Sequence, residues 1–336
     1  MVVGHVTAQR GAVVRIGPIT RAGVDRLRER SLAQYVLRRL VQSVFVLAGL
    51  TIVVFFVTRQ IGDVARLMLP IDATEQQYIE MRQALGLNDP LLVQFGRYVV
   101  NLLRGDFGMS IWQNVPAMDL VIARFPATAT LAFSTLIFSL AVALPVGIGA
   151  ALKPGSIFDR IATVVSIFGL SVPTFWLALL MITVLSVQLG WFKTSGYGGI
   201  EYLILPMLAI SAQSIGRLAQ VVKTSMLDVL NSQYLVTARS KGLYESVILI
   251  RHGLRNALLP IVTIIGDEII GLLNGSVVIE VIFGWPGIGK LTIDAIERRD
   301  FAVIQASVIF VALTVIVVNL IVDMVYAWLD PRIRYS

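Results

Sequence analysis

The feature that most constrains this chain is the run from Ala127 to Leu152, 26 residues without a charged side chain. About 20 mostly apolar residues in a helix cross the hydrocarbon core of a bilayer. Uncharged runs also cover 40–58, 161–192 and 301–322. Two weaker apolar runs cover 202–222, interrupted by Arg217, and 257–278, interrupted by Asp267 and Glu268. With 56% hydrophobic and only 15% charged residues, the chain does not have the composition of a soluble globular domain. We therefore predict an all-α integral membrane protein with six transmembrane helices.

Basic residues indicate which segments stay in the cytoplasm. Residues 1–39 carry eight basic and two acidic residues, and 217–255 carries six and two. Cytoplasmic segments collect lysine and arginine in this way, whereas long loops such as the charge-balanced 59–125 cross regardless of charge. Both termini are therefore predicted to be cytoplasmic. The predicted regions are a basic tail near anionic lipid (1–36), span 1 (37–58), an external segment (59–125), a core with spans 2–6 (126–330) and a cytoplasmic tail (331–336).

The external segment 59–125 is predicted to be helical rather than an unstructured linker. Thr74 and Gln77 have the spacing of a capping box for a helix that runs through Gln83. Asp89-Pro90 supplies an N-cap and a first-turn proline for a second helix. An apolar stripe at helical spacing follows over 91–103, and such a stripe packs on the domain or the membrane interface more often than it binds a ligand.

Several classes of chemistry are excluded by composition. The chain has no cysteine and two histidines, which argues against disulfides, zinc–thiolate sites, iron–sulfur clusters and histidine metal cages. We attribute the net charge of +7 to lysine and arginine in cytoplasmic segments, which set the orientation in the membrane, rather than to nucleic-acid binding. The stretch FGWPGIGKLT (283–292) matches the G-x-x-x-x-G-K core of a phosphate-binding loop. Leu291 stands where such a loop needs serine or threonine, and the stretch is predicted to lie outside, so we interpret it as a turn with an interfacial Trp285.

The segment 223–256 is too polar to insert into the membrane and is predicted to form a helix, a glycine turn at Gly242 and a second helical stretch. Two interpretations remain open from topology alone. The segment is either an ordinary basic loop at the lipid headgroups or a docking element for a cytosolic partner.

Five stretches together resemble a known family. They are ALGLNDPLLVQFGRYVVNLLRGDFGMS, RFPATATLAF with LPVGIGAAL, QYLVTARSKGLYESVILIRHGLRNALLP, VIEVIFGWPGIGKLTIDAIERRDFAVIQ and VDMVYAWLDPRIRYS. In this order they resemble permease subunits of binding-protein-dependent ABC importers, and in particular the first permease of dipeptide, oligopeptide and nickel systems. The resemblance runs from about Tyr35 to Ser336. It implies the type I ABC importer permease fold and no enzymatic activity in this chain.

The resemblance also implies partners and site residues. The partners would be a second homologous permease, two ATPase domains that bind ATP and Mg, and an extracytoplasmic solute-binding protein, in a bacterial inner membrane. The helix–turn–helix at about 230–256 would couple to an ATPase subunit, although the family's glutamate is replaced by Val236. The coupling residues are then Val236, Thr237, Ala238, Arg239, Gly242 and Glu245. FGWPGIGK would form an external turn with Trp285, Pro286 and Gly287 facing the binding protein or the partner permease.

Asp267 and Glu268 form an acidic pair inside the fifth span. Carboxylates within a membrane are costly and usually face a cavity or a partner. One hypothesis is that Asp267, Glu268 and nearby Asn274 line a translocation path and attract a substrate ammonium group. The alternative is a buried structural pair. For Asp323 in the last span we predict a structural role, with an arginine of the 330–332 tail as its partner.

Peptides are the predicted cargo, with nickel or another small solute as the alternative within the same kind of complex. A stand-alone secondary transporter driven through Asp267 and Glu268 is a further alternative. A membrane-embedded enzyme is disfavoured, because the sequence offers no nucleophile–base pair or metal cluster.

Overall fold

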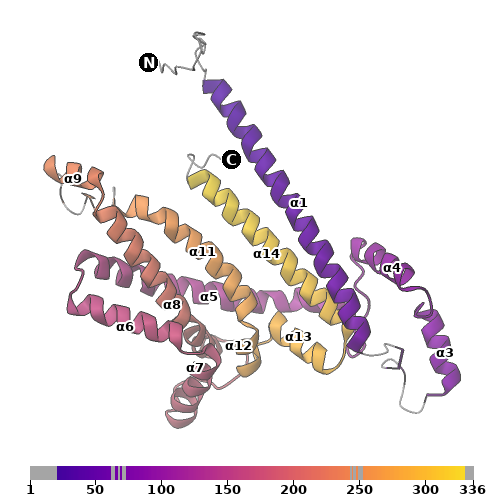
Figure 1. The fold of residues 1–336 in the computed structure, drawn as a ribbon. Coiled ribbons are helices and arrows are strands. Elements are labelled where there is room, and N and C mark those ends of the chain that lie inside the picture. The colour runs from indigo at the N-terminus through magenta and orange to yellow at the C-terminus, as the bar shows by residue number, and fades with distance from the viewer. Residues whose placement is uncertain are drawn as a thin grey trace, which may run out of the picture.

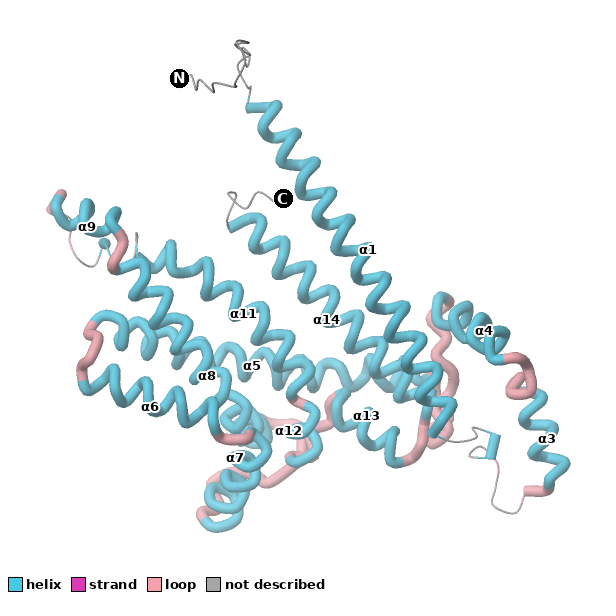
Figure 2. The backbone as a smooth tube through the Cα atoms, in the orientation of Figure 1, coloured by secondary structure: helices cyan, strands magenta, loops and turns pink. Residues whose placement is uncertain are grey.

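The computed structural model describes residues 21–61, 65–66, 69, 73–242, 244, 247–248 and 253–329. Figures 1 and 2 show helices joined by loops, and the described residues form no strand beyond an isolated bridge between Met109 and Pro116. The helices are α1 (Arg21–Ile61), α3 (Glu75–Ala84), α4 (Leu91–Leu103), α5 (Ala117–Leu152), α6 (Ile157–Ser171), α7 (Thr174–Met181), the π-helix η1 (Ile182–Gln188), α8 (Ile200–Leu230), α9 (Gln233–Ser240), α11 (Arg255–Gly275), α12 (Val277–Ile282), α13 (Ile288–Glu297) and α14 (Phe301–Leu329).

Among these residues, four helices are long and apolar enough to cross a membrane: Leu37–Thr58 within α1, α5, α8, and Phe301–Val325 within α14. The pair formed by α6 and α7–η1 qualifies as a fifth span. The remaining expected span, the fifth in sequence order, corresponds to α11, which carries Asp267 and Glu268 and packs between α8 and α14. The start of α1, the end of α14 and α9 lie at one end of the bundle, with α3, α12 and α13 toward the other (Figure 1).

The apolar run 161–192, which we predicted to hold the third span and a short overrun, is sharply bent. α6 and the α7–η1 pair meet at an angle of 100°, and the break falls at Val172-Pro173. Proline disfavours the helical conformation in the residue before it, and Val172 is accordingly extended, with ψ near 125°. Proline also lacks the N–H that would continue the ladder of helical hydrogen bonds.

The centre of the bundle is held by close contacts between helix backbones. α5 makes its most extensive contact with α8, and α6 also packs on α8. A Cβ added at Gly169 of α6 would lie 2.4 Å from the Ala212 carbonyl oxygen, and one at Gly216 of α8 would lie 2.6 Å from the Ser166 carbonyl oxygen. Small residues at such crossings are how membrane helices gain packing energy. α5, α6 and α8 therefore form one tightly packed unit.

The helices of the segment 59–125 follow the sequence prediction closely. The Thr74–Gln77 capping box is present, and α3 ends one residue beyond Gln83. Asp89 does not cap α4 as expected, because Pro90 takes the N-cap position and the Asp89 carboxylate pairs with Arg97 at 2.7 Å. α4 packs on α1 through Tyr98 and Phe95, and burial raises the pKa of the Tyr98 hydroxyl to about 12.

Candidate translocation surface and coupling helix

One face of α11 is exposed and carries small or polar residues. Its exposed positions recur at helical spacing and include Thr263, Asp267, Gly271, Asn274 and Gly275. A Cβ added at either glycine would meet no atom of the chain. Asn274 also lines a mostly apolar cavity of about 900 Å³ between α1, α11 and α14. The structure thus places two of the three predicted path residues, Asp267 and Asn274, on one surface.

Glu268 lies on the face of α11 that packs against α8 and is 6% exposed. It accepts a hydrogen bond from the Ser214 hydroxyl of α8, and its Oε2 is 3.6 Å from Arg217 Nη1. Asp267, by contrast, makes no hydrogen bond or ion pair with the described residues. The two neighbouring acids therefore have different environments, and Glu268 fits the alternative of a buried structural group.

α8 extends the polar surface of α11. The exposed side chains of its second half include Gln213, Arg217, Thr224 and Asp228, again at helical spacing. Polar and charged groups of this kind within a spanning helix face a water-filled cavity or another protein chain. The neighbouring faces of α8 and α11, which we call the polar surface, are the candidate translocation surface.

The predicted coupling residues gather on the short helix α9. Leu235 is fully buried and anchors α9, whereas Val236, Thr237 and Arg239 are exposed and Ala238 is half-buried. Gly242 follows the helix with φ of +75°, a left-handed conformation that favours glycine. Glu245 and most of the predicted second helical stretch lie outside the described residues. α9 stands at the tip of α8, away from the centre of the bundle (Figure 1).

The stretch FGWPGIGK wraps around a fully buried carboxylate that the sequence analysis missed. Glu280 Oε1 accepts hydrogen bonds from Thr128 Oγ1 at 2.8 Å and Ser276 Oγ at 3.1 Å. Its Oε2 accepts from the backbone N–H of Lys290 at 3.1 Å, in the first turn of α13. We call these three hydrogen-bond donors around Glu280 the cage. A helix N-terminus favours a negative charge, so the cage stabilises the Glu280 carboxylate and ties α5, α12 and α13 together.

The cage changes two expectations about the turn in FGWPGIGK. Trp285 is 2% exposed and donates through Nε1 to the Ala127 carbonyl oxygen at 2.8 Å, so the interpretation of Trp285 as interfacial is wrong. Gly287 is also buried, because a Cβ there would lie 2.3 Å from the Glu280 carboxyl group, while Pro286 remains half-exposed. The stretch that resembles a phosphate-binding loop therefore surrounds a carboxylate of the chain itself, that of Glu280.

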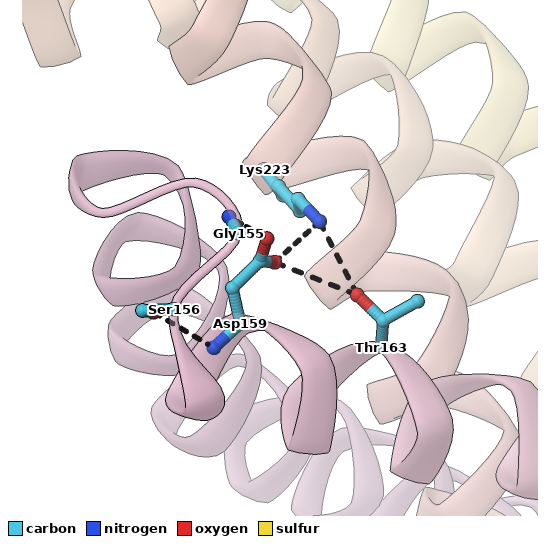
Figure 3. A network of polar contacts seen from close by, with 5 residues as sticks. All are labelled: Gly155, Ser156, Asp159, Thr163 and Lys223. Atoms are coloured by element: carbon cyan, nitrogen blue, oxygen red, sulfur yellow. Dashed lines mark hydrogen bonds and ion pairs between the residues drawn. The ribbon is translucent and has the colours of Figure 1, made fainter.

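Two further ion pairs connect helices. Asp323 of α14 pairs with Arg39 of α1 at 3.0 Å, so its partner differs from the expected tail arginine, and the tail lies outside the described residues. Asp159 in the first turn of α6 pairs with Lys223 of α8 (Figure 3). Lys223 Nζ also donates to Thr163 Oγ1 at 3.2 Å. Sequence analysis missed this second pair, although charged residues at the edges of two apolar runs are the signal that could have indicated it.

Comparison with known proteins agrees with this architecture. Residues 143–335 match the family described as binding-protein-dependent transport system inner membrane component, and 32–132 match the N-terminal family of the same component. The chain belongs to this family. The permease is 40% identical over 316 residues to the oligopeptide transport system permease protein AppB of Bacillus subtilis, covering 90% of this chain and 100% of that protein. It is 39% identical over 303 residues to the glutathione transport system permease protein GsiC of Escherichia coli strain K12, covering 90% and 99%.

Solved structures show the same fold. An inward-facing structure of the MetNI methionine ABC transporter superposes with a TM-score of 0.55 at 18% identity, covering 63% of the permease and 97% of that chain. An amino acid ABC transporter with histidines superposes with a TM-score of 0.50 at 17% identity, covering 64% and 94%. The type I fold of ABC importer permeases is thereby established for this multi-pass membrane protein, whose family has no catalytic activity of its own.

Proposed function

We propose that the permease is the transmembrane subunit of an ATP-driven importer that moves peptides into the cytoplasm. The observation that carries the proposal is α9, a short helix with an exposed face at the tip of α8, in a chain of this family. A rigid helix held away from the bundle suits the transmission of a push from a partner. The names of the two relatives support oligopeptides or the tripeptide glutathione as the class of cargo.

The proposed complex contains a second homologous permease, two ATPase domains that bind ATP and Mg, and an extracytoplasmic solute-binding protein. We place both termini and α9 in the cytoplasm of a bacterium and α3, α4 and α13 outside. Two observations support this: the basic excess in 1–39 and 217–255, and the common end of the bundle shared by α1, α9 and α14 (Figure 1). The segment boundaries at 36, 58, 125 and 330 belong to the same proposal.

Within this complex, α9 would contact an ATPase subunit through Val236, Thr237 and Arg239, with Ala238 and Gly242 shaping the helix and its reversal. Glu245 would belong to the same contact. Closure of the ATPases would then move α8 together with α5 and α6, because these three helices are packed backbone to backbone. Rocking of such a unit against its partner alternates access to a cavity at the middle of the membrane.

The polar surface would line that cavity. Asp267 is exposed on it without a partner among the described residues, and a carboxylate there attracts the ammonium group of a peptide. Asn274 offers an amide on the same face of α11. Glu268 would act indirectly, by holding Arg217 and Ser214 of α8 against α11.

Reconstitution tests the proposed function. The permease is placed in proteoliposomes either alone or with the second permease and the ATPases, and uptake of a radiolabelled tripeptide is measured with and without ATP. Uptake that requires ATP, the other subunits and the binding protein is the expected result. Uptake by the permease alone along a proton or sodium gradient would instead support a secondary transporter, and uptake of nickel without uptake of peptide would replace the cargo.

A further inference from the structure

We propose that a small pocket on the outer end of the permease receives an acidic side chain of the docked solute-binding protein. The pocket, called here the basic pocket, has a volume of about 160 Å³ and is lined in part by α13. α13 lies at the opposite end of the bundle from α9 (Figure 1). Its walls include Trp112, Arg124, Pro286, Lys290, Arg298 and Asp300. The inference rests on the proposed function, which supplies a partner at this end of the molecule.

The acidic groups of the basic pocket are already satisfied. The Asp294 carboxylate, also in the wall, accepts two hydrogen bonds from Lys290 Nζ, at 2.7 and 2.9 Å. Asp300 is 3% exposed and accepts hydrogen bonds from the Ser110 hydroxyl and from the backbone N–H groups of Trp112 and Val303. The Asp294 charge is thus paired with Lys290. The charge of the buried Asp300 offsets one of the two arginines, so the pocket wall keeps a net charge of +1.

Two guanidinium groups in the same wall have no carboxylate. Arg124 projects from α5, is half-buried, and makes no hydrogen bond or ion pair with the described residues. Arg298 stacks over the Trp112 ring, with its Cζ 3.4 Å from the ring centroid, and forms no ion pair with them. Two planar guanidinium groups that line the same pocket are suited to bind a carboxylate through several charge-assisted hydrogen bonds.

The dimensions and position of the basic pocket favour a protein side chain over a peptide substrate. The volume is less than a fifth of the 900 Å³ cavity that Asn274 lines, and the two cavities have no wall residue in common. The rim includes Trp112, whose side chain is 58% exposed. Exposed tryptophan beside arginine is the composition of binding hot spots at protein–protein interfaces.

The test uses the full importer in lipid nanodiscs, with the solute-binding protein of the same importer as the probe. ATP hydrolysis is measured while the binding protein is titrated. Arg124→Gln and Arg298→Gln should each raise the half-saturating concentration roughly fivefold or more, because a desolvated charge pair is lost. The maximal rate of ATP hydrolysis should be the same as that of the unmodified importer, since neither residue lies on the polar surface. Arg124→Lys keeps the charge without the fork and should give an intermediate value.

Arg104→Gln is the matched control, because Arg104 is an exposed arginine after α4 that does not line the pocket. An unchanged half-saturating concentration in both glutamine variants would overturn the pocket proposal and leave the importer function standing. The pocket proposal would also be overturned if the glutamine variants lost uptake only of peptides with a free C-terminal carboxylate. Uptake of C-terminally amidated peptides and the half-saturating concentration of the binding protein would then be unchanged, which would show that the pocket binds cargo. Arg298 is exposed, so its variant tests the pocket even where Arg124→Gln lowers the yield of complex.

Discussion

Asp267 and Glu268 are adjacent in sequence, yet their side chains have opposite roles in the structure. Asp267 is exposed on the polar surface, whereas Glu268 is buried against α8. We expect Asp267→Asn to lower uptake of peptides with a free N-terminus roughly twofold to fivefold, because an exposed charge pair contributes up to about 1 kcal/mol. Uptake of N-acetylated peptides should change little. Radiolabelled uptake in proteoliposomes measures both.

Glu268→Gln serves as the comparison for Asp267→Asn. It removes the charge that faces Arg217, so it should lower the melting temperature of the purified permease, which Asp267→Asn should not do. Equal uptake of free and acetylated peptides by Asp267→Asn would contradict the role given to Asp267.

Gly287 contacts the buried Glu280 carboxylate more closely than any larger residue could. We expect Gly287→Ala to destabilise the permease by about 1–3 kcal/mol, because the added methyl group overpacks the cage. Gly96→Ala in α4 is the matched control, since a Cβ there meets no atom of the chain and alanine favours the helix by up to about 1 kcal/mol. Thermal unfolding in detergent distinguishes the two, and an equal effect of both changes would argue against the cage.

At the scale of elements, the ion pair between Asp159 and Lys223 joins the first turn of α6 to α8 just before α9 (Figure 3). We expect Lys223→Met to lower the melting temperature, because Asp159 loses its cation. Asp159→Asn combined with Lys223→Met should recover part of the loss, because no charge is then left without a partner. A double-mutant cycle measures the coupling, and strictly additive effects would show that the pair contributes nothing of its own.

Sequence patterns predicted some elements better than others, for identifiable physical reasons. The capping box at Thr74 and the apolar run of α5 depend on local rules, and both appear as predicted. A proline inside an apolar run indicates a bend at Pro173, but length and apolarity do not give the 100° angle between the two parts of the span. The Glu280 cage was missed because its donors come from Thr128, Ser276 and Lys290, which only the fold brings together.

The different environments of Asp267 and Glu268 could also not be predicted without the structure. Their composition marks both as costly in a membrane, but only the rotation of α11 about its axis decides which one faces a neighbour. Asn274 follows from Asp267 by helical spacing. The candidate translocation surface was thus half predictable: its helix was predicted from the sequence, and its face was not.

At the scale of the whole molecule, the absence of cysteine allows a direct test of orientation. Single cysteines are introduced at Gln76 in α3 and at Ser240 in α9, both of which are exposed. A membrane-impermeant maleimide applied to spheroplasts should label Gln76→Cys and leave Ser240→Cys unlabelled until the membrane is opened. Labelling of Ser240→Cys in sealed cells would invert the proposed orientation and remove the basis for coupling to a cytosolic ATPase.

The buried acid at position 280 has a consequence for how this protein can change over generations. Without Glu280, the hydroxyl groups of Thr128 and Ser276 and the Lys290 N–H would lose an acceptor in a place that water does not reach. Conversely, any residue larger than glycine at 287 would push the acid out. Homologous chains with a larger residue at the position of Gly287 should therefore also have replaced the acid, whereas chains without the acid are free to keep the glycine.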